Sequence, residues 1–489
     1  MRQQDTYAAG GTTRNRVFSR GRGLLTVISA LPVLLVSYLC CHYVRAELLL
    51  GLFLVEWIVV LAAWRSLCPK LGGHRSAVLA AVPFLLSFCV AALVTRENMS
   101  VYMAVWTGSD DWWYLQEAGR VVDTLRSSGW NLIEAWSELT SVWIGAAWTL
   151  AGWPFLLGLI SSLVPSENTP AVLHAIALSL NATFLTLILA LIFHVFEEPA
   201  RRFPWRALLC FLFMSGDPLV YAAMSLKESM LLLSLMLLFV ACVKLSRRIQ
   251  IQWIIWGLLG MAGVVTSRLV YMPLVLLGFY WLAVGRTRLS MVLKVIIGLV
   301  LIASLAGLLH NFSIREVTIA DVVSGRKLAA ETGIAMTIYN IPVVGPVLYY
   351  AISPVPPLPW KILSQEQVIT TLIRGAGSTA WFFAACYVLF GIAKNRRLLK
   401  DRLFVSAAIM FLGIFIAAVL YADDPRYKQP TNFYLSIMLF LTWYNWSIRH
   451  PVVVVRRSND SKNASDILCR HPQGQSFSVE SLCSDVRRC

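Results

Sequence analysis

The chain has 489 residues, of which 58% are hydrophobic and 14% charged, and its formal net charge is +16. A soluble globular chain carries roughly a quarter charged residues, so this composition excludes an ordinary soluble protein. The positive charge is spread over short segments between apolar runs rather than gathered on one face, which argues against nucleic acid as a partner.

Runs of about 17–25 nearly uncharged residues are long enough to cross a bilayer core. Such runs predict an all-α polytopic membrane protein with about twelve transmembrane helices. They lie at 24–43, 46–64, 77–94, 171–195, 206–224, 229–243, 251–266, 269–284, 291–309, 377–393, 403–421 and 432–448.

Lys and Arg orient these spans, because short basic loops stay in the cytoplasm. With the N-terminus inside, the predicted cytoplasmic segments hold 29 of the 42 Lys and Arg but only 8 of the 26 Asp and Glu. These segments are 1–23, 65–76, 196–206, 244–250, 285–294, 394–402 and 449–489. We therefore expect a plasma (cell inner) membrane protein with both termini in the cytoplasm.

This topology divides the chain into seven regions. A basic N-terminus precedes three spans, a long extracytoplasmic loop, further spans, a second extracytoplasmic loop, the C-terminal spans and a polar tail that we expect to be disordered. Their bounds are 1–23, 24–94, 95–170, 171–309, 310–376, 377–448 and 449–489.

Residues 142–164 are also apolar enough to span, but a span here would invert every later loop. We predict a re-entrant or interfacial element instead. Its tryptophans favour the headgroup region, since the indole ring is apolar and its N–H needs a partner. They are Trp143, Trp148 and Trp153.

The first extracytoplasmic loop contains adjacent acids, Asp110 and Asp111, followed by Trp112, Trp113 and Tyr114. Repulsion between adjacent carboxylates is relieved if one is protonated, binds a metal or faces a cation. One of them can act as a general base toward an acceptor hydroxyl. The alternative is an acidic turn that caps a helix starting at Trp112.

Lys227 and Glu228 lie between two apolar runs, at a predicted membrane boundary. Ionisable residues there are costly unless they are paired or face a polar cavity. Lys227 can bind a phosphate as a point charge, and Glu228 can face the same cavity as the acidic pair. The alternative is a turn whose lysine reaches the headgroups.

Arg426 and Tyr427 lie in a predicted outer turn, where a guanidinium can bind phosphate oxygens bidentately. The alternative is an ion pair with Asp423 or Asp424. Arg268 is flanked by apolar sequence, and we expect its partner to be either a lipid phosphate or Glu228.

Glu56 lies inside the second apolar run; we assign it first to helix packing, with a catalytic role as the more remote alternative. No CxxC, HExxH, P-loop or GxGxxG motif occurs, and the positions of the ten cysteines imply no disulfide framework.

Together these features resemble the GT-C superfamily of membrane glycosyltransferases, of the bacterial surface-polysaccharide type, which use polyprenyl-phosphate-linked sugars. The similar stretches cover roughly 77–440 in layout. They are Gly108-Ser109-Asp110-Asp111 with Tyr114 and Ala118, the span around Asn181, Gly216-Asp217-Pro218 through Lys227-Glu228, and Pro356-Pro357-Leu358-Pro359-Trp360. In most members the acidic loop follows the first span, whereas here it follows the third. Either two helices were added, or the acidic pair is not the family's motif.

The resemblance implies interfacial helices in the first extracytoplasmic loop and an inverting glycosyl transfer. The donor would be a polyprenyl-phosphate-linked sugar, the acceptor a glycan or lipid, and the surroundings membrane lipids. A divalent cation is compatible with this chemistry but not required, and its ligands are unknown. The resemblance implies that Asp110 and Asp111 are the catalytic pair. It implies that the donor phosphate is bound by Lys227, Arg268 and Arg426. The implied supporting groups are Tyr114, Glu228 and Tyr427.

Two other functions remain open. A polysaccharide polymerase or O-antigen-ligase-like enzyme also joins lipid-linked glycans but uses arginines in large outer loops, and the basic residues of 310–376 suit it. A lipid-linked glycan transporter or flippase also has about a dozen spans. It would need charges along the bundle interior, where the predicted spans offer little beyond Glu56, His174 and His194.

Overall fold

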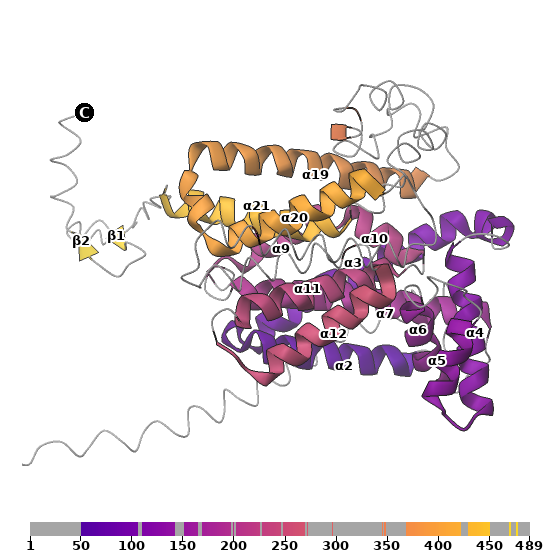
Figure 1. Cartoon of the computed structure of the whole chain (residues 1–489). Coiled ribbons are helices and arrows are strands. Elements are labelled where there is room, and N and C mark those ends of the chain that lie inside the picture. Colours follow the sequence, from indigo (N-terminus) through magenta and orange to yellow (C-terminus); the bar gives the residue numbers. More distant parts are fainter. Residues whose placement is uncertain are drawn as a thin grey trace, which may run out of the picture.

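The computed structural model describes residues 50–105, 110–141, 151–164, 169–196, 202–224, 227–245, 248–268, 368–421 and 429–449, the pairs 469–470 and 476–477, and a few single positions between these ranges. The described part is a helical bundle, and most of its helices run roughly side by side (Figure 1).

Most of the predicted apolar runs coincide with helices of this bundle. The helices are α2 (Leu50–Leu67), α3 (Gly73–Val105), α7 (Pro170–Phe196), α9 (Pro204–Met214), α10 (Gly216–Ala223), α11 (Glu228–Leu245), α12 (Ile251–Arg268), α19 (Val368–Lys394), α20 (Arg402–Tyr421) and α21 (Pro430–Arg449). Short 3₁₀ segments follow α2 and α19, at Pro69–Leu71 (η2) and Arg396–Lys400 (η5). The predicted spans at 24–43, 269–284 and 291–309 lie outside the described residues.

Four described helices are long and apolar enough to cross a membrane. They lie at Arg75–Thr95 within α3, Pro170–Phe196, Glu228–Leu245 and Val368–Lys394, and the bent pair α9–α10 adds a fifth if it counts as one span. The all-helical, membrane-type architecture expected from composition is therefore confirmed for the described part of the chain.

The helix α7 forms the centre of the bundle and packs against α2, α3 and α11. It is apolar on all sides, as a fully enclosed helix must be. Two of its polar side chains bond to neighbouring helices. The Ser179 hydroxyl donates to Glu56 Oε2 at 2.5 Å, and the Asn181 amide donates to the Ala222 carbonyl at 2.9 Å. Glu56 thus has the packing environment that we expected for it.

The predicted span at 206–224 is broken rather than continuous. The axes of α9 and α10 differ by 61°, and the break falls at Ser215. Pro218 has no N–H to bond with the Met214 carbonyl four residues earlier, so the helix cannot continue unchanged. Asn432 of α21 donates to that carbonyl at 3.0 Å instead. Buried backbone groups at membrane depth require such replacement partners.

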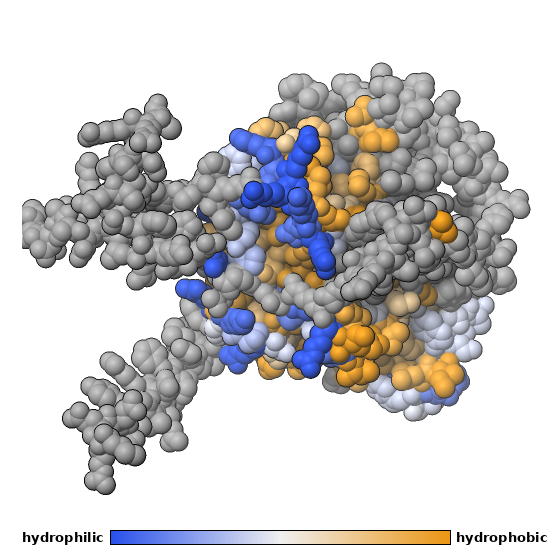
Figure 2. Space-filling view, turned by 60° about the vertical axis from the view of Figure 1, so that its left-hand side comes forward, coloured by the Kyte–Doolittle hydropathy of each residue, from blue (hydrophilic) through white to orange (hydrophobic). Residues whose placement is uncertain are grey.

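Basic side chains gather at one end of the bundle, which we call the basic end. Contacts of His194 Nδ1 with the Leu67 carbonyl, of the Arg206 guanidinium with the Trp443 ring and of Lys394 Nζ with the Trp446 ring join the helix termini there. Its exposed cations come from predicted cytoplasmic segments and include Arg65, Lys70, Arg202, Arg248, Lys394, Arg396, Arg397 and Lys400. Figure 2 turns this end forward and shows hydrophilic side chains gathered beside hydrophobic surfaces.

At the opposite end, α4 (Asp110–Ser127) runs steeply across the direction of the bundle helices, and α5 (Leu132–Ser141) folds back beside it (Figure 1). We call this the α4 end. Two-residue strands β1 (Cys469–Arg470) and β2 (Ser476–Phe477) pair antiparallel elsewhere in the chain.

The helix α6 (Gly152–Ser162) packs against α4 on one side and against the bundle helices α7 and α12 on the other. A Cβ at Gly158 would lie 2.7 Å from the Ala118 carbonyl oxygen of α4, and one at Gly152 would lie 3.0 Å from the Thr266 carbonyl oxygen of α12. The eleven residues of α6 span about 16 Å. This length is less than the roughly 30 Å of a bilayer core, so α6 by itself is too short to cross a membrane. Trp153 is fully buried in protein, whereas Trp143 and Trp148 lie outside the described residues.

Candidate functional site

The acidic pair begins the helix α4. Asp110 and Asp111 are its first two residues, so the helix begins ahead of the start at Trp112 that the capping alternative expected. Carboxylates in the first turn interact favourably with the N-terminal end of a helix dipole. The backbone of both residues is described and their side chains are not.

Tyr114 joins α4 to the turn between α10 and α11. Its side chain is buried, one helical turn after Asp110, and Lys227 Nζ lies 5.4 Å from the centroid of its ring. Lys227 is only 3% exposed. A cation over a tyrosine ring is attracted to its face, more strongly when desolvated. Two stretches that the sequence placed in one predicted site therefore meet in the structure, although they are more than one hundred residues apart.

Glu228 and Arg268 form a buried ion pair. Arg268 Nη2 donates to Glu228 Oε1 at 2.8 Å, and the side chains of Arg268 and Glu228 are 10% and 5% exposed respectively. The pair links the first residue of α11 to the last residue of α12. Of the two partners that the sequence allowed for Arg268, the structure provides the carboxylate. The role of Arg268 as a phosphate ligand stays a prediction.

Arg374 is a residue that the sequence analysis did not assign to the site. We placed it in the second extracytoplasmic loop, but α19 begins at Val368 and includes it. Its Nη2 donates to the Tyr221 hydroxyl of α10 at 2.9 Å. The available signal was a charge close to the start of an apolar run, which is costly without a partner.

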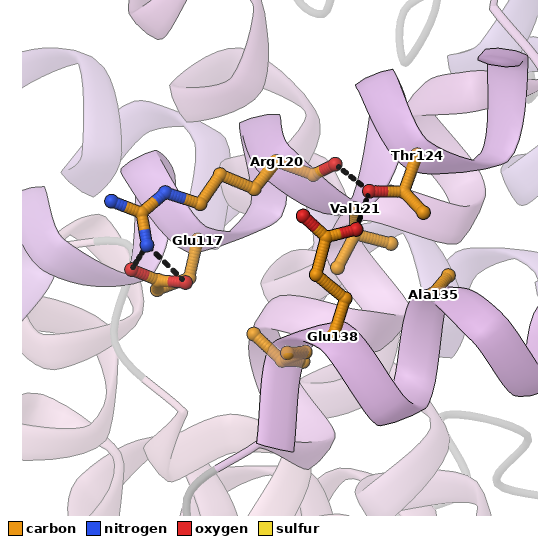
Figure 3. Close-up of a pocket in the computed structure, with 7 residues that line it drawn as sticks. Glu117, Arg120, Val121, Thr124, Ala135 and Glu138 are labelled. Carbon is orange, nitrogen blue, oxygen red and sulfur yellow. Dashed lines mark hydrogen bonds and ion pairs between the residues drawn. The ribbon is translucent and has the colours of Figure 1, made fainter. Parts of the chain in front are cut away.

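A pocket opens between α4 and α5, a helical turn beyond Tyr114 (Figure 3). Its volume is about 140 Å³, and it is lined by Glu117, Arg120, Val121, Thr124, Ala135, Glu138 and Leu139. Arg120 Nη1 lies 3.1 Å from Glu117 Oε1, and the Thr124 hydroxyl donates to Glu138 Oε2 at 2.5 Å. The spacing of Glu117 and Arg120, three residues apart, is the signal that could have found this pair.

Burial raises the pKa of Glu117 above its ordinary value. The nearby Arg120 guanidinium opposes this effect and the Glu138 carboxylate adds to it. Glu117 is 2% exposed, so loss of hydration outweighs the attraction of the partly exposed Arg120 side chain.

Several predicted residues cannot be placed. Arg426 and Tyr427 lie outside the described residues, as does most of the second extracytoplasmic loop. Within the described part, no three His, Cys, Asp or Glu side chains gather in a way that could hold a metal ion. The structure thus brings Tyr114 to Lys227, and Glu228 to Arg268, at the two adjacent positions where the α10–α11 turn leads into α11.

No protein-family model, curated protein or solved structure matches this chain.

Proposed function

We propose that the chain is an inverting membrane glycosyltransferase, with about twelve spans and a GT-C-like arrangement. It would move a sugar from a polyprenyl-phosphate-linked donor to a glycan or lipid acceptor. The proposal locates the reaction on the extracytoplasmic face of the plasma (cell inner) membrane, in surface polysaccharide biosynthesis. The gathering of cations at the basic end supports this orientation, because basic segments stay in the cytoplasm.

The observation that carries the proposal is the contact between Tyr114 and Lys227. Tyr114 follows Asp110 by one helical turn, so its contact with the buried Lys227 supports a shared site for the acidic pair and this lysine. Transfer of a sugar from a lipid phosphate needs a base for the acceptor hydroxyl and a cation for the departing phosphate. An acidic helix start and a lysine on neighbouring elements supply both groups.

In the proposed reaction, Asp110 or Asp111 takes the proton of the acceptor hydroxyl. The hydroxyl oxygen forms a bond to the anomeric carbon as the bond from that carbon to the phosphate oxygen breaks. The phosphate leaves with the electron pair, and Lys227 stabilises its charge, aided by Arg268 and Arg426. Tyr114 holds Lys227 in place, and Glu228 and Tyr427 support the two arginines.

Profiling of surface glycans and lipid-linked sugars tests the proposal. Cells carry Asp110→Asn or Asp111→Asn, with membrane insertion checked and Glu134→Gln, an exposed carboxyl on α5, as the matched control. We expect at least one Asp variant to lose a single sugar from the glycan while its lipid-linked donor accumulates. Shortened glycans with intact repeat units would instead indicate the polymerase or ligase. An unchanged glycan in both Asp variants would remove the acidic pair from the mechanism.

A further inference from the structure

Arg374 lies in the second turn of α19, a helix long and apolar enough to cross a membrane. Its guanidinium carbon lies 5.3 Å from the centroid of the Tyr221 ring, and its Nη2 donates to the hydroxyl of the same residue. Among the described residues, no Asp or Glu lies within ion-pair distance of Arg374. A phenol hydroxyl is a neutral acceptor, so it satisfies one N–H and leaves the positive charge unbalanced.

This situation differs from that of Arg268, whose charge is balanced by Glu228 at 2.8 Å. A guanidinium at membrane depth is costly without a counter-charge, and such residues pair with one another or mark ligand pathways. Arg374 is partly exposed, so a ligand can approach it from the open side.

A second residue on α19 has an unused hydrogen-bonding group. Ser378 follows Arg374 by one helical turn, which places both on one face of α19. Its side chain is 1% exposed, and its hydroxyl has no hydrogen-bond partner among the described residues; the same holds for Arg374 Nε. Buried polar atoms in folded proteins nearly always have a partner.

The backbone around these groups is closely packed. A Cβ at Gly377 would lie 2.9 Å from the Asp217 backbone nitrogen, and one at Gly216 would lie 2.8 Å from the Gly377 Cα. The helices α10 and α19 therefore touch through their backbones, next to Tyr221 and Arg374. A site on a rigid frame binds with less loss of conformational freedom.

We propose that Arg374, Tyr221 and Ser378 form a binding site for a phosphate group. The planar fork of a guanidinium matches phosphate oxygens bidentately. The Tyr221 hydroxyl accepts from Arg374 and holds the guanidinium in place, and the Ser378 hydroxyl donates to a phosphate oxygen. The phosphate supplies the missing negative charge. This site uses other helices than the Lys227–Tyr114 contact, and it does not depend on sugar transfer.

Binding to the purified full-length chain in detergent tests the proposal. The probes are a short-chain polyprenyl phosphate, the polyprenol of the same length and inorganic phosphate, each followed by native mass spectrometry and thermal unfolding. We expect a phosphate-bearing probe to bind and raise the unfolding temperature, and the polyprenol not to. Binding of only the polyprenyl phosphate identifies a lipid headgroup as the ligand, whereas equal binding of inorganic phosphate identifies a free anion.

Variants separate a ligand site from a structural contact. Arg374→Gln should weaken phosphate binding at least tenfold, and Arg374→Lys less, because it keeps the charge but loses the fork. Tyr221→Phe should weaken it several-fold. Without ligand, Arg374→Gln should unfold at the same or a higher temperature than the wild type, because an unbalanced charge is removed. The control is Arg397→Gln, an exposed cation at the basic end, which should bind as the wild type does.

Two outcomes would overturn the site. One is a wild-type protein that binds neither phosphate probe. The other is an Arg374→Gln protein that unfolds at a lower temperature without ligand yet binds phosphate as before, because Arg374 would then be a purely structural partner of Tyr221.

Discussion

Asn432 Nδ2 donates to the backbone carbonyl of Met214 at 3.0 Å, across 218 residues of sequence. This carbonyl is the one that Pro218 leaves without its helical donor. The side chain of Asn432 is buried, so the bond is sealed from solvent. The broken helix α9–α10 therefore depends on α21 for the hydrogen bond to its Met214 carbonyl.

Loss of this bond should destabilise the bundle. We expect Asn432→Leu to cost about 1–3 kcal/mol in the free energy of unfolding, because a buried carbonyl is left without a donor. Asn445→Leu is the matched control, since the Asn445 amide donates to the Leu441 carbonyl one turn earlier in its own helix, α21. Thermal unfolding in detergent measures both. Equal losses in the two variants would show that the bond to Met214 has no special role.

The close contact of α10 and α19 predicts that alanine destabilises the protein at Gly377 but not at Gly257. Gly377→Ala places a methyl group against backbone atoms that cannot move aside, and we expect a loss of about 1–3 kcal/mol in unfolding free energy. Gly257→Ala meets only the Ala241 methyl at 3.5 Å, an ordinary contact, and should be neutral or stabilising. A Gly377→Ala protein as stable as wild type would contradict the backbone contact.

The buried pair of Glu228 and Arg268 predicts strong coupling. Removing one charge, by Glu228→Gln or Arg268→Gln, should cost about 3–5 kcal/mol, because the other charge is left buried and unbalanced. The variant carrying both Glu228→Leu and Arg268→Met should recover most of the loss. A double-mutant cycle of Glu228→Leu, Arg268→Met and the variant carrying both, followed by unfolding in denaturant, measures the coupling, and additive effects would exclude a direct interaction in the folded protein.

The raised pKa of Glu117 predicts that the stability of the folded protein depends on pH. Its folded-state pKa is raised by burial, so the folded protein binds its proton more tightly than the unfolded chain. The resulting stabilisation is complete below the ordinary Glu pKa of about 4.3 and is lost as pH rises through the raised value. At neutral pH the ionised carboxylate therefore destabilises the folded state.

Glu117→Gln should accordingly unfold at a higher temperature than wild type at neutral pH, and the difference should shrink as pH falls toward 4.3. Thermal unfolding measured across this pH range tests it. Glu134→Gln, which removes an exposed carboxyl from the same hairpin, is the control for lost charge alone. A Glu117→Gln protein less stable than wild type at neutral pH would show that the ion pair with Arg120 outweighs desolvation.

Apolar runs predicted helix positions well where the helix is regular. The run at 171–195 becomes α7, which begins and ends within one residue of it. The break at Ser215 could be predicted from the neighbouring Gly216 and Pro218. The hydrogen-bond donor to the Met214 carbonyl, Asn432, lies far away in the sequence on α21 and could not be predicted from the residues near the break. Arg374 was assigned to the loop 310–376 because the predicted span begins at 377, whereas α19 begins at Val368 and Tyr221 on another helix accepts from one N–H group of Arg374.

For the candidate site, the sequence indicated individual residues but not which of them contact one another. Charge near a membrane boundary singled out Lys227, Glu228 and Arg268, and the family resemblance of the acidic segment singled out Tyr114. Which of these residues pair with one another depends on how α4, α11 and α12 pack. That packing rests on small residues such as Gly158, whose need for space only the folded structure reveals.

We propose that the start of α4 and Lys227 belong to one reaction site. Mass spectrometry of surface glycans and lipid-linked sugars tests this in cells carrying Asp110→Asn, Asp111→Asn, Lys227→Gln or Lys227→Arg, with membrane insertion checked for each. We expect an Asp variant and Lys227→Gln to lose the same sugar and accumulate the same lipid-linked donor, and Lys227→Arg to retain part of the transfer. An inserted Lys227→Gln protein with a normal glycan, beside an Asp variant that loses a sugar, would contradict it.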